Sequence, residues 1–388
     1  MTGTFWNGSR RRFIGAATAT ATAGTAIALG ATAGFGAQAA AQSTPAATPE
    51  ATPAGAIDLS PAAPAELGAP EVPAAAISTA SKAVPEAVAF APYANFGTDA
   101  APGIFPRTIR HAFGETTIEK KPERVVVLDT GELDASVILG ITPVGAAEYL
   151  ASGLPDYIAS RQNDIQLVGT TAEPDLEAIL ALKPDLILSS KLRHDESVYA
   201  LLSDIAPTVF AERPGVTFKQ NFRLYAEALG REAEARHVMD LYEDGVRALN
   251  TELPSPRPTT SIVQIRPDIV RFYMRANFLG QILTDLGLPR NDAENVDDFA
   301  FDGSQENLGE YANGDLVILA VQGGDSNEAA PGILASPVWE SLPAVQTDNV
   351  LEAPSDVFIG GIGYGSAMIV VNTIGQYFGL EPVIALPE

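Results

Sequence analysis

The organisation of the chain depends on one stretch, REAEARHVMDLYEDGVRALNTEL at residues 231–253. Its apolar residues recur every three or four positions, which is the spacing of one helical face, and charged residues lie between them. These apolar residues are Val238, Leu241, Tyr242, Val246 and Leu249. Gly230 precedes the stretch and Pro254 follows it. The pattern therefore predicts one continuous helix, roughly 34 Å long.

Strand and helix patterns alternate on both sides of this helix over similar lengths of chain. Short β-branched or aliphatic runs such as residues 124–129 and 315–321 are typical of strands buried in a parallel sheet. The sequence therefore predicts an α/β protein with two Rossmann-like lobes, residues 107–230 and 254–388, joined by the single long helix at 231–253. A long surface helix within one domain is the alternative interpretation.

The two halves also share a short motif. Pro174-Asp-Leu-Glu177 opens a predicted helix that leads into Pro184-Asp-Leu-Ile-Leu188. Ser304-Gln-Glu306 opens a predicted helix that leads into Gly314-Asp-Leu-Val-Ile-Leu319. Because the two copies lie on either side of the long helix, they favour two similar lobes.

The first 106 residues differ in composition from the rest. Residues 1–41 combine Arg10-Arg11-Arg12, an Ala/Thr/Gly-rich core and small residues near a cleavage position, which indicates a twin-arginine export signal. An uncleaved membrane anchor is the alternative. Residues 42–106 are rich in Ala and Pro and predict a disordered tether. Three aromatic residues near its end are candidates for local docking: Phe90, Tyr93 and Phe96.

The overall composition limits the classes of function. The chain has 24 Lys and Arg residues against 48 Asp and Glu, so its formal net charge is -24. That balance argues against a nucleic-acid partner, which would need a basic patch. It favours a protein that works outside the cell. The chain has no cysteine, which excludes disulfides, thiolate metal sites and a lipid-anchored N-terminal cysteine.

Several stretches together resemble one known group of proteins. They are PERVVVL (122–128), LEAILALKPDLI (176–187), KLRH (191–194), LSDIAPTV (202–209), residues 266–287, WESLPAV (339–345) and DVFIGGIG (356–363). The chain resembles the extracytoplasmic substrate-binding proteins of ABC importers for iron–siderophore complexes, over about residues 108–378. The resemblance implies two α/β lobes, one long connecting helix and a ligand cleft between the lobes. Many relatives carry a lipid-anchor cysteine that this chain lacks.

The resemblance predicts a ligand-binding role for arginines of the chain. A ferric siderophore arrives with its iron already chelated, so the protein needs cations around a cleft and no metal ligands of its own. Arginine suits oxygen-rich anions because its planar fork donates several hydrogen bonds and stays charged. Arg193 and Arg266 each follow a predicted strand, where open α/β sheets bind ligands, and Arg271 lies close behind Arg266. We expect these three arginines to bind the ligand, although ion pairs at the surface are the alternative for each.

Aromatic residues and a histidine complete the predicted ligand site. Tyr273 lies next to the arginines in sequence, and the family pattern puts Trp339 and Phe358 near the cleft. His194 either lines the cleft or lies beside it. A position in the core is the alternative for each aromatic residue. The chain has three histidines, and none has the spacing of a metal site, so we expect no metal ligands and no cofactor.

Two glutamates suggest contact with a membrane partner. Glu177 and Glu306 lie at matching places in the repeated motif. In the resembled family, such acids on each lobe meet arginine pockets on the permease. We therefore expect Glu177 and Glu306 to dock on the permease of an ABC importer, which works with its own ATPase. A favourable charge at a helix N-terminus is the alternative.

The predicted function is capture of a ferric siderophore and delivery to that permease, without catalysis, by a monomer in the periplasm or at the outer face of the cytoplasmic membrane. A haem- or cobalamin-binding protein of the same fold is the nearest alternative, with Tyr273 or His194 as an axial ligand of haem. An exported α/β hydrolase is a remote one, because the sequence shows no supported nucleophile or base. A surface adhesion module would leave the cleft arginines without a role.

Overall fold

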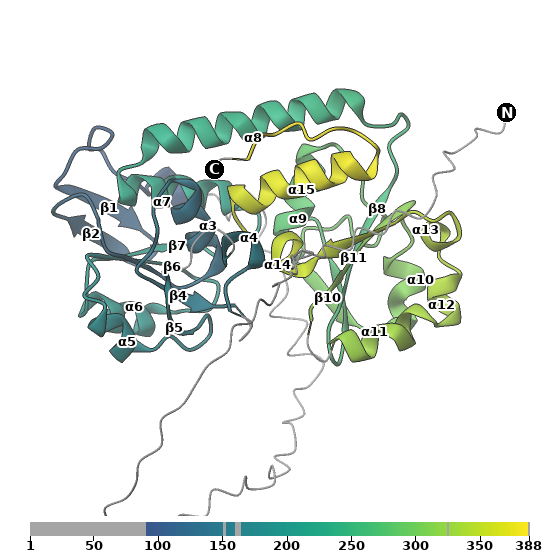
Figure 1. Ribbon diagram of the computed structural model, residues 1–388, viewed down its shortest axis with the longest axis horizontal. Helices are drawn as coiled ribbons and strands as arrows, with labels where there is room; N and C mark the ends of the chain where they lie inside the picture. Colours follow the sequence, from purple (N-terminus) through teal and green to yellow (C-terminus); the bar gives the residue numbers. More distant parts are fainter. Residues whose placement is uncertain (1–90, 150–152, 160–163, 324–325, 387–388) are drawn as a thin grey trace, which may run out of the picture. The chain divides into compact units, whose positions relative to one another are not determined.

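A computed structural model of the chain describes residues 91–149, 153–159, 164–323 and 326–386. The predicted export signal and most of the predicted tether, residues 1–90, lie outside the described residues. Among the helices that are described, none has the length and apolar character needed to cross a bilayer. Figure 1 shows the arrangement of the described elements.

The N-terminal half, residues 107–230, contains a parallel sheet of five strands in the order β5-β4-β3-β6-β7. Its strands are β3 (Val125–Val127), β4 (Gly145–Glu148), β5 (Gln166–Thr170), β6 (Leu186–Ser190) and β7 (Thr208–Ala211). Its helices are α3 (Thr130–Ile138), α4 (Asp156–Ala159), α5 (Leu176–Ala181), α6 (Glu196–Ser203) and α7 (Phe218–Leu229). Every residue of β3, β6 and β7 is buried, as the continuous apolar runs predict for strands covered on both faces.

The described part of the chain includes residues before the predicted boundary at residue 107. A 3-10 helix, η1 (Ala91–Ala94), precedes a hairpin of β1 (Arg107–His111) and β2 (Gly114–Ile118). Gly97 forms an antiparallel bridge with Arg110 of this hairpin. The last part of the predicted tether is therefore attached to the N-terminal half. Local docking of Tyr93 and Phe96 is confirmed, whereas Phe90 lies outside the described residues.

The C-terminal half, residues 254–388, contains a mixed sheet in the order β10-β9-β8-β11-β12. Its strands are β8 (Thr260–Ile265), β9 (Val270–Tyr273), β10 (Ala300–Gly303), β11 (Leu316–Val321) and β12 (Val350–Pro354). Its helical elements are α9 (Phe278–Asp285), η2 (Gln305–Asn307), α10 (Leu308–Tyr311), α11 (Ser326–Leu334), α12 (Pro337–Glu340), α13 (Pro343–Gln346), α14 (Ser355–Phe358) and α15 (Tyr364–Tyr377). The strand β9 runs antiparallel to both of its neighbours, β8 and β10, so the two halves are less alike than their shared motif suggested.

The predicted long helix is present as α8 (Glu232–Glu252), within one residue of its expected ends. Val238, Tyr242, Val246 and Leu249 are buried as expected, and Leu241 is half-buried. Figure 1 shows α15 running beside α8, and the two helices are in contact. The helix α8 is therefore packed against α15 and α7 and does more than connect the two halves.

One hydrophobic core continues from the first half into the second. It includes side chains of α3, α7, α8, α9 and α15. The ring of Tyr364 on α15 packs against Phe218 and Phe222 of α7, at centroid distances of 5.6 and 4.7 Å. It also meets Tyr242 of α8 at 5.3 Å. Phe218 in turn contacts Phe278 of α9 at 5.1 Å. The halves are thus joined by packed aromatic side chains as well as by α8.

Candidate functional site

The carboxyl ends of the parallel strands of both sheets meet around one pocket, which is the edge where open α/β sheets bind ligands. Segments after β4, β6 and β7 reach it from one half, and segments after β8, β11 and β12 from the other. Its volume is ≈ 220 Å³, or ≈ 890 Å³ with the space open to solvent. The lining residues are Tyr149, Leu192, Arg193, Arg213, Pro214, Gly215, Gln264, Arg266, Arg271, Tyr273, Asn277, Phe278, Phe299, Gln322, Ile359 and Ile362.

The charge of this pocket is opposite to that of the chain. Four arginines line it, and no aspartate or glutamate does so within the described part of the chain. Arg193 and Arg213 come from the N-terminal half, and Arg266 and Arg271 from the C-terminal half. In a protein with a net charge of -24, such a concentration of guanidinium groups marks an anion-binding site.

Arg193 follows β6 and is oriented by a carboxylate behind the pocket wall. Its Nε lies 3.3 Å from Oδ2 of Asp129, whose side chain is 5% exposed. The other oxygen of Asp129 accepts a hydrogen bond from the backbone N–H of Thr130 and caps α3. Burial raises the pKa of Asp129, and the nearby Arg193 guanidinium partly opposes that rise. The pair holds one arginine of the pocket in a fixed direction.

Arg213 follows β7 and was not predicted from the sequence. Its guanidinium carbon lies 5.3 Å from the ring centre of Phe299, a cation–π contact across the two halves. Burial lowers the pKa of Arg213, and repulsion from Arg193 and Arg271 lowers it further. Arginine still stays charged at neutral pH. The group is therefore a cation without a carboxylate partner among the described residues, next to two further cations.

The two arginines of the C-terminal half differ in their partners. Arg271 on β9 donates two hydrogen bonds to the carboxylate of Asp302 on β10, at 2.5 and 2.6 Å. Arg266 follows β8 and forms no ion pair within the described residues, and its buried Nε has no hydrogen-bond partner there. Arg266 and Arg213 are thus the pocket arginines whose charge an incoming anion would balance first.

Polar side chains around the arginines are held in place by hydrogen bonds. The hydroxyl of Tyr273 donates to Oε1 of Gln264 at 2.9 Å, and Nε2 of Gln264 donates to Oγ of Ser355 at 2.8 Å. Tyr273 is 4% exposed, so only its edge reaches the pocket. This network fixes the wall between Arg266 and Arg271 before any ligand arrives.

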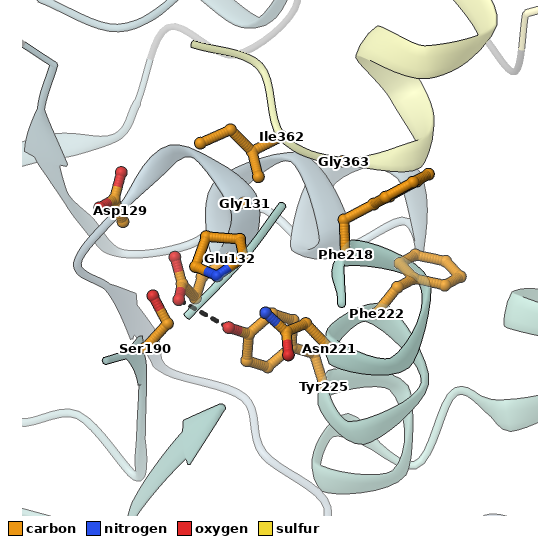
Figure 2. A pocket seen from close by; sticks show the side chains of 11 residues that line it. Asp129, Gly131, Glu132, Ser190, Phe218, Asn221, Phe222, Tyr225, Ile362 and Gly363 are labelled. Atoms are coloured by element: carbon orange, nitrogen blue, oxygen red, sulfur yellow. Dashed lines mark hydrogen bonds between the residues drawn. The ribbon is translucent and has the colours of Figure 1, made fainter. Parts of the chain in front are cut away.

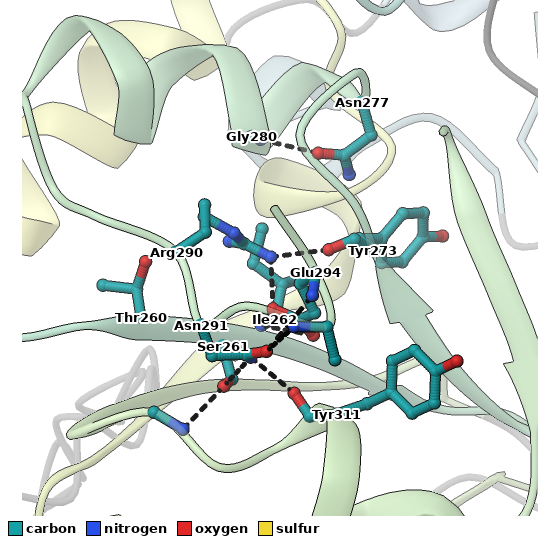
Figure 3. A network of polar contacts seen from close by, with 12 residues as sticks. Thr260, Ser261, Ile262, Tyr273, Asn277, Gly280, Arg290, Asn291, Glu294 and Tyr311 are labelled. Atoms are coloured by element: carbon teal, nitrogen blue, oxygen red, sulfur yellow. Dashed lines mark hydrogen bonds and ion pairs between the residues drawn. The ribbon is translucent and has the colours of Figure 1, made fainter. Parts of the chain in front are cut away.

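A buried ion pair supports the strand that carries Tyr273, as Figure 3 shows. Arg290 donates both to the backbone carbonyl of Tyr273 and to the carboxylate of Glu294. Glu294 accepts the backbone N–H of Ile262 on β8. Burial raises the pKa of Glu294, although Arg290 opposes the rise. The pair therefore ties β8 and the end of β9 together behind the pocket.

A second buried carboxylate lies behind Asp129. Figure 2 shows Glu132 pointing towards Tyr225, whose hydroxyl donates to Oε1 of Glu132 at 2.6 Å. Burial raises the pKa of Glu132 to about 7, and the charge of Asp129 adds to the rise. Arg193 favours the ionised form of Asp129, whereas Glu132 takes up a proton near neutral pH.

Three predicted ligand residues do not line the pocket. Trp339 is 6% exposed and lies in the core of the C-terminal half, in one cluster with Val263 and Leu319. Phe358 is fully buried in the core shared by both halves, although its neighbour Ile359 does line the pocket. His194 is 5% exposed, and its ring exchanges a hydrogen bond with Oγ of Ser189 at 3.0 Å. Trp339 and Phe358 therefore occupy core positions, which was the alternative for each aromatic residue, and His194 directly follows the pocket residue Arg193.

The two predicted docking residues are both exposed. Glu177 lies in the first turn of α5, and Glu306 in the first turn of η2. Neither takes part in an ion pair within the described part of the chain. Their contact with a permease stays a prediction.

Comparison with known proteins identifies the family and the fold. Residues 125–357 match the family described as periplasmic binding protein. The chain belongs to the periplasmic binding protein family. This match covers both sheets and all four pocket arginines, and the family consists of binding proteins.

Curated relatives of this periplasmic binding protein cover most of its described part. The probable siderophore-binding lipoprotein YfiY of Bacillus subtilis is 32% identical over 285 residues, which is 70% of this chain and 87% of the relative. The Fe(3+)-citrate-binding protein YfmC of the same organism is 30% identical over 256 residues, 65% of this chain and 79% of the relative.

A solved structure agrees with the arrangement of the two halves. Staphylococcus aureus SirA complexed with staphyloferrin B is 31% identical, with a TM-score of 0.64. The similarity covers 71% of this chain and 99% of the SirA chain. The periplasmic binding protein described here therefore has the two-lobe fold of siderophore-binding proteins, as the sequence predicted.

Proposed function

We propose that this protein is the extracytoplasmic substrate-binding component of an ABC importer and that it captures a ferric siderophore whose complex is anionic. The observation that carries the proposal is the pocket with four arginines and no carboxylate in its lining among the described residues. The relatives named for binding siderophores or ferric citrate support the same class of ligand.

The charge of the pocket favours some siderophores over others. Three hydroxamates neutralise ferric iron, whereas catecholate and citrate-type chelators leave the complex with negative charge. Each guanidinium can donate two hydrogen bonds to carboxylate or catecholate oxygens. A neutral complex would leave the half-buried Arg266 without a counter-charge and its buried Nε without an acceptor, which costs free energy. The anionic complexes are therefore the expected ligands.

The arginines also explain how binding would couple the halves. A ligand held by Arg193 and Arg213 on one side and by Arg266 and Arg271 on the other bridges both sheets. It shifts the population towards the form in which the four cations are nearest to one another, because the ligand cancels their repulsion. The protein forms no covalent bond with the ligand and hands it intact to the permease.

The test is a binding titration by calorimetry with matched probes. Ferric citrate and a ferric tris-catecholate should bind, and a ferric trihydroxamate should bind more weakly. Replacing Arg266→Ala should weaken binding of ferric citrate about 10- to 100-fold, since a hydrogen bond to a charged group contributes about 1.5–3 kcal/mol. The control Arg275→Ala removes an exposed arginine that pairs with Asp297 outside the pocket and should leave the affinity unchanged.

Two results would contradict the proposal. One is failure of the purified protein to bind any of the three ferric probes. The other is a Soret band on mixing with hemin that Tyr149→Phe abolishes, which would favour haem, because the Tyr149 side chain lines the pocket.

A further inference from the structure

The chain segment before the first strand packs against α7 and the loop after β7. We call residues 91–106 the strap. Gly97 and Arg110 exchange backbone hydrogen bonds of 2.9 Å, so the strap extends the hairpin edge. The backbone N–H of Thr98 donates to Glu227 of α7 at 2.9 Å. Gly97 has φ +99, and a Cβ there would lie 2.4 Å from Glu227 Oε2, so only glycine allows this approach.

At the start of the strap, Tyr93 reaches the loop after β7. Its hydroxyl donates to Oδ1 of Asn221 on α7 and accepts the backbone N–H of Glu212 at 3.3 Å. Nδ2 of Asn221 donates to the backbone carbonyl of Glu212 at 2.9 Å. Both backbone polar groups of Glu212 are therefore held by a ring of three hydrogen bonds. Burial raises the pKa of Tyr93, so its hydroxyl stays protonated and available as a donor.

The residue held in this way is the neighbour of a pocket arginine. Arg213 follows Glu212 directly, and its carbonyl accepts a hydrogen bond from Oγ1 of Thr217 at 2.6 Å. The carboxylate of Glu212 forms an ion pair with Lys191 at 3.1 Å, two residues before Arg193. The loop after β7 is thus fixed at its start by Tyr93 and connected to the loop after β6.

Arg213 needs such support for electrostatic reasons. Arg213 is exposed, and its guanidinium lies within the field of Arg193 and Arg271, both of which repel it. A side chain under repulsion from its neighbours moves away when the backbone below it is free to shift. Gly215, in the same loop, has φ +127, and a Cβ there would lie 2.8 Å from the carbonyl of Ala276, so the loop already abuts the other half.

We propose that Tyr93 is a positioning residue for anion binding, because the strap holds the Glu212 backbone and thereby keeps Arg213 in the pocket. This inference rests on the proposed function. It assigns the strap a role in ligand affinity.

The decisive experiment is a double-mutant cycle on affinity for ferric citrate, measured by calorimetry. Tyr93→Phe removes the hydroxyl and keeps the ring that packs on Phe96 at 5.0 Å. In the full-length chain it should weaken binding about 3- to 10-fold, the range for one lost hydrogen bond. In an Arg213→Ala background it should change affinity less than about twofold, because the group that it positions is gone.

A matched control and a second readout separate positioning from general stability. Tyr377→Phe removes another half-buried tyrosine hydroxyl, which donates to Asn349 at 3.3 Å away from the pocket, and should leave affinity unchanged. Hydrogen exchange of the Glu212 amide, measured without ligand, should become roughly tenfold faster in Tyr93→Phe and stay unchanged in Tyr377→Phe.

The outcomes distinguish this inference from the proposed function. Unchanged exchange at Glu212 in Tyr93→Phe would overturn the positioning role, and so would an equal loss of affinity with and without Arg213. A wild-type protein that binds no ferric probe would overturn the proposed function. The predicted effect of Tyr93→Phe on affinity would then be overturned too. A wild-type protein that binds ferric citrate, with Tyr93→Phe binding equally well, would overturn the inference alone.

Discussion

The carboxylate of Asp134 accepts a hydrogen bond from the backbone N–H of Ser366 at 2.9 Å, although 232 positions separate the two residues in the chain. Its other oxygen accepts the N–H of Gly365 at 2.8 Å. A buried carboxylate of α3 therefore caps the N-terminus of α15 in the other half, where the helix dipole favours negative charge. This contact and the packing around Tyr364 join the halves beyond α8.

Asp134 makes the stability of the protein depend on pH. Burial raises the pKa of Asp134 to about 6 from 3.8, although hydrogen bonds from Tyr157, Gly365 and Ser366 oppose the rise. A carboxyl group whose pKa is higher in the folded than in the unfolded protein stabilises the fold at low pH. This stabilisation is complete below the pKa of the unfolded state and is lost as the pH rises through the pKa of the folded state. We expect up to about 3 kcal/mol to be lost between about pH 4 and pH 6. Glu132 adds a loss in the same direction up to about pH 7.

The measurement is thermal or denaturant unfolding at about pH 7.5 and about pH 4. The wild type should be more stable at the lower pH, and Asp134→Asn and Glu132→Gln should each reduce that difference. Asp244→Asn is the control, because it replaces a carboxylate of α8 that is 71% exposed. An Asp134→Asn protein with the pH dependence of the wild type would show that this carboxyl does not carry the effect.

The fold was accessible from the sequence because its signals are local. The apolar face of residues 231–253 and the β-branched runs before and after it are properties of neighbouring residues, and they predicted α8, β3, β6 and β11 correctly. The antiparallel strand β10 was missed because its sequence, AFDG, is short and contains only two apolar residues. Its pairing is determined by contacts with β9, including Arg271 with Asp302, which no local pattern encodes.

The site was predicted only in part. The rule that ligands bind after parallel strands correctly put Arg193 and Arg266 at the pocket, and the same rule would have found Arg213, two residues beyond β7. Trp339 and Phe358 were misplaced because an apolar ring has the same sequence signature in a core as in a pocket wall. Their burial depends on which helix covers which face of the sheet, which is a property of the whole fold.

The buried pair of Arg290 and Glu294 should be much more sensitive to single than to double replacement. Above pH 8, where the Glu294 carboxyl with its pKa of about 8 is ionised, Glu294→Gln leaves a guanidinium that is 3% exposed without a counter-charge, which should destabilise the fold by about 3–5 kcal/mol. Arg290→Met combined with Glu294→Met removes both charges and should be no more destabilising than Glu294→Gln. The midpoint of urea unfolding measures each variant. Additive losses in the double variant would show that the two charges do not depend on each other.

The aromatic packing between the halves should limit how far the protein closes on its ligand. Because the chain has no cysteine, spin labels can be attached at Leu201→Cys and Glu340→Cys, which are exposed in different halves. The distance between the labels should change by only a few ångströms when ferric citrate binds. Tyr364→Ala should broaden the distance distribution, because Tyr364 is fully buried between α7 and α8.

The control for this measurement is Tyr377→Ala, at the other end of α15, where the side chain is half-buried. It should leave the distance distribution narrow. A shift of more than about 10 Å on ligand binding to the wild type would contradict the prediction, because hinge closure on that scale requires the packed core to separate.

Charge reversal at the two predicted docking residues should separate transport from binding. Glu177 and Glu306 are exposed on different halves, and neither lines the arginine pocket. Two acidic groups on a rigid body fix its orientation on a partner with two basic pockets. A lysine in place of either acid would be repelled by the basic pocket that it faces. Glu177→Lys with Glu306→Lys should therefore lower iron uptake by cells about tenfold or more, while calorimetry shows unchanged affinity for ferric citrate.

The control is Glu243→Lys with Glu252→Lys, which changes the net charge by the same amount on α8, where both residues are exposed. This pair should leave uptake unchanged. An equal loss of uptake in this control pair would show that total charge matters and that Glu177 and Glu306 have no specific role in docking.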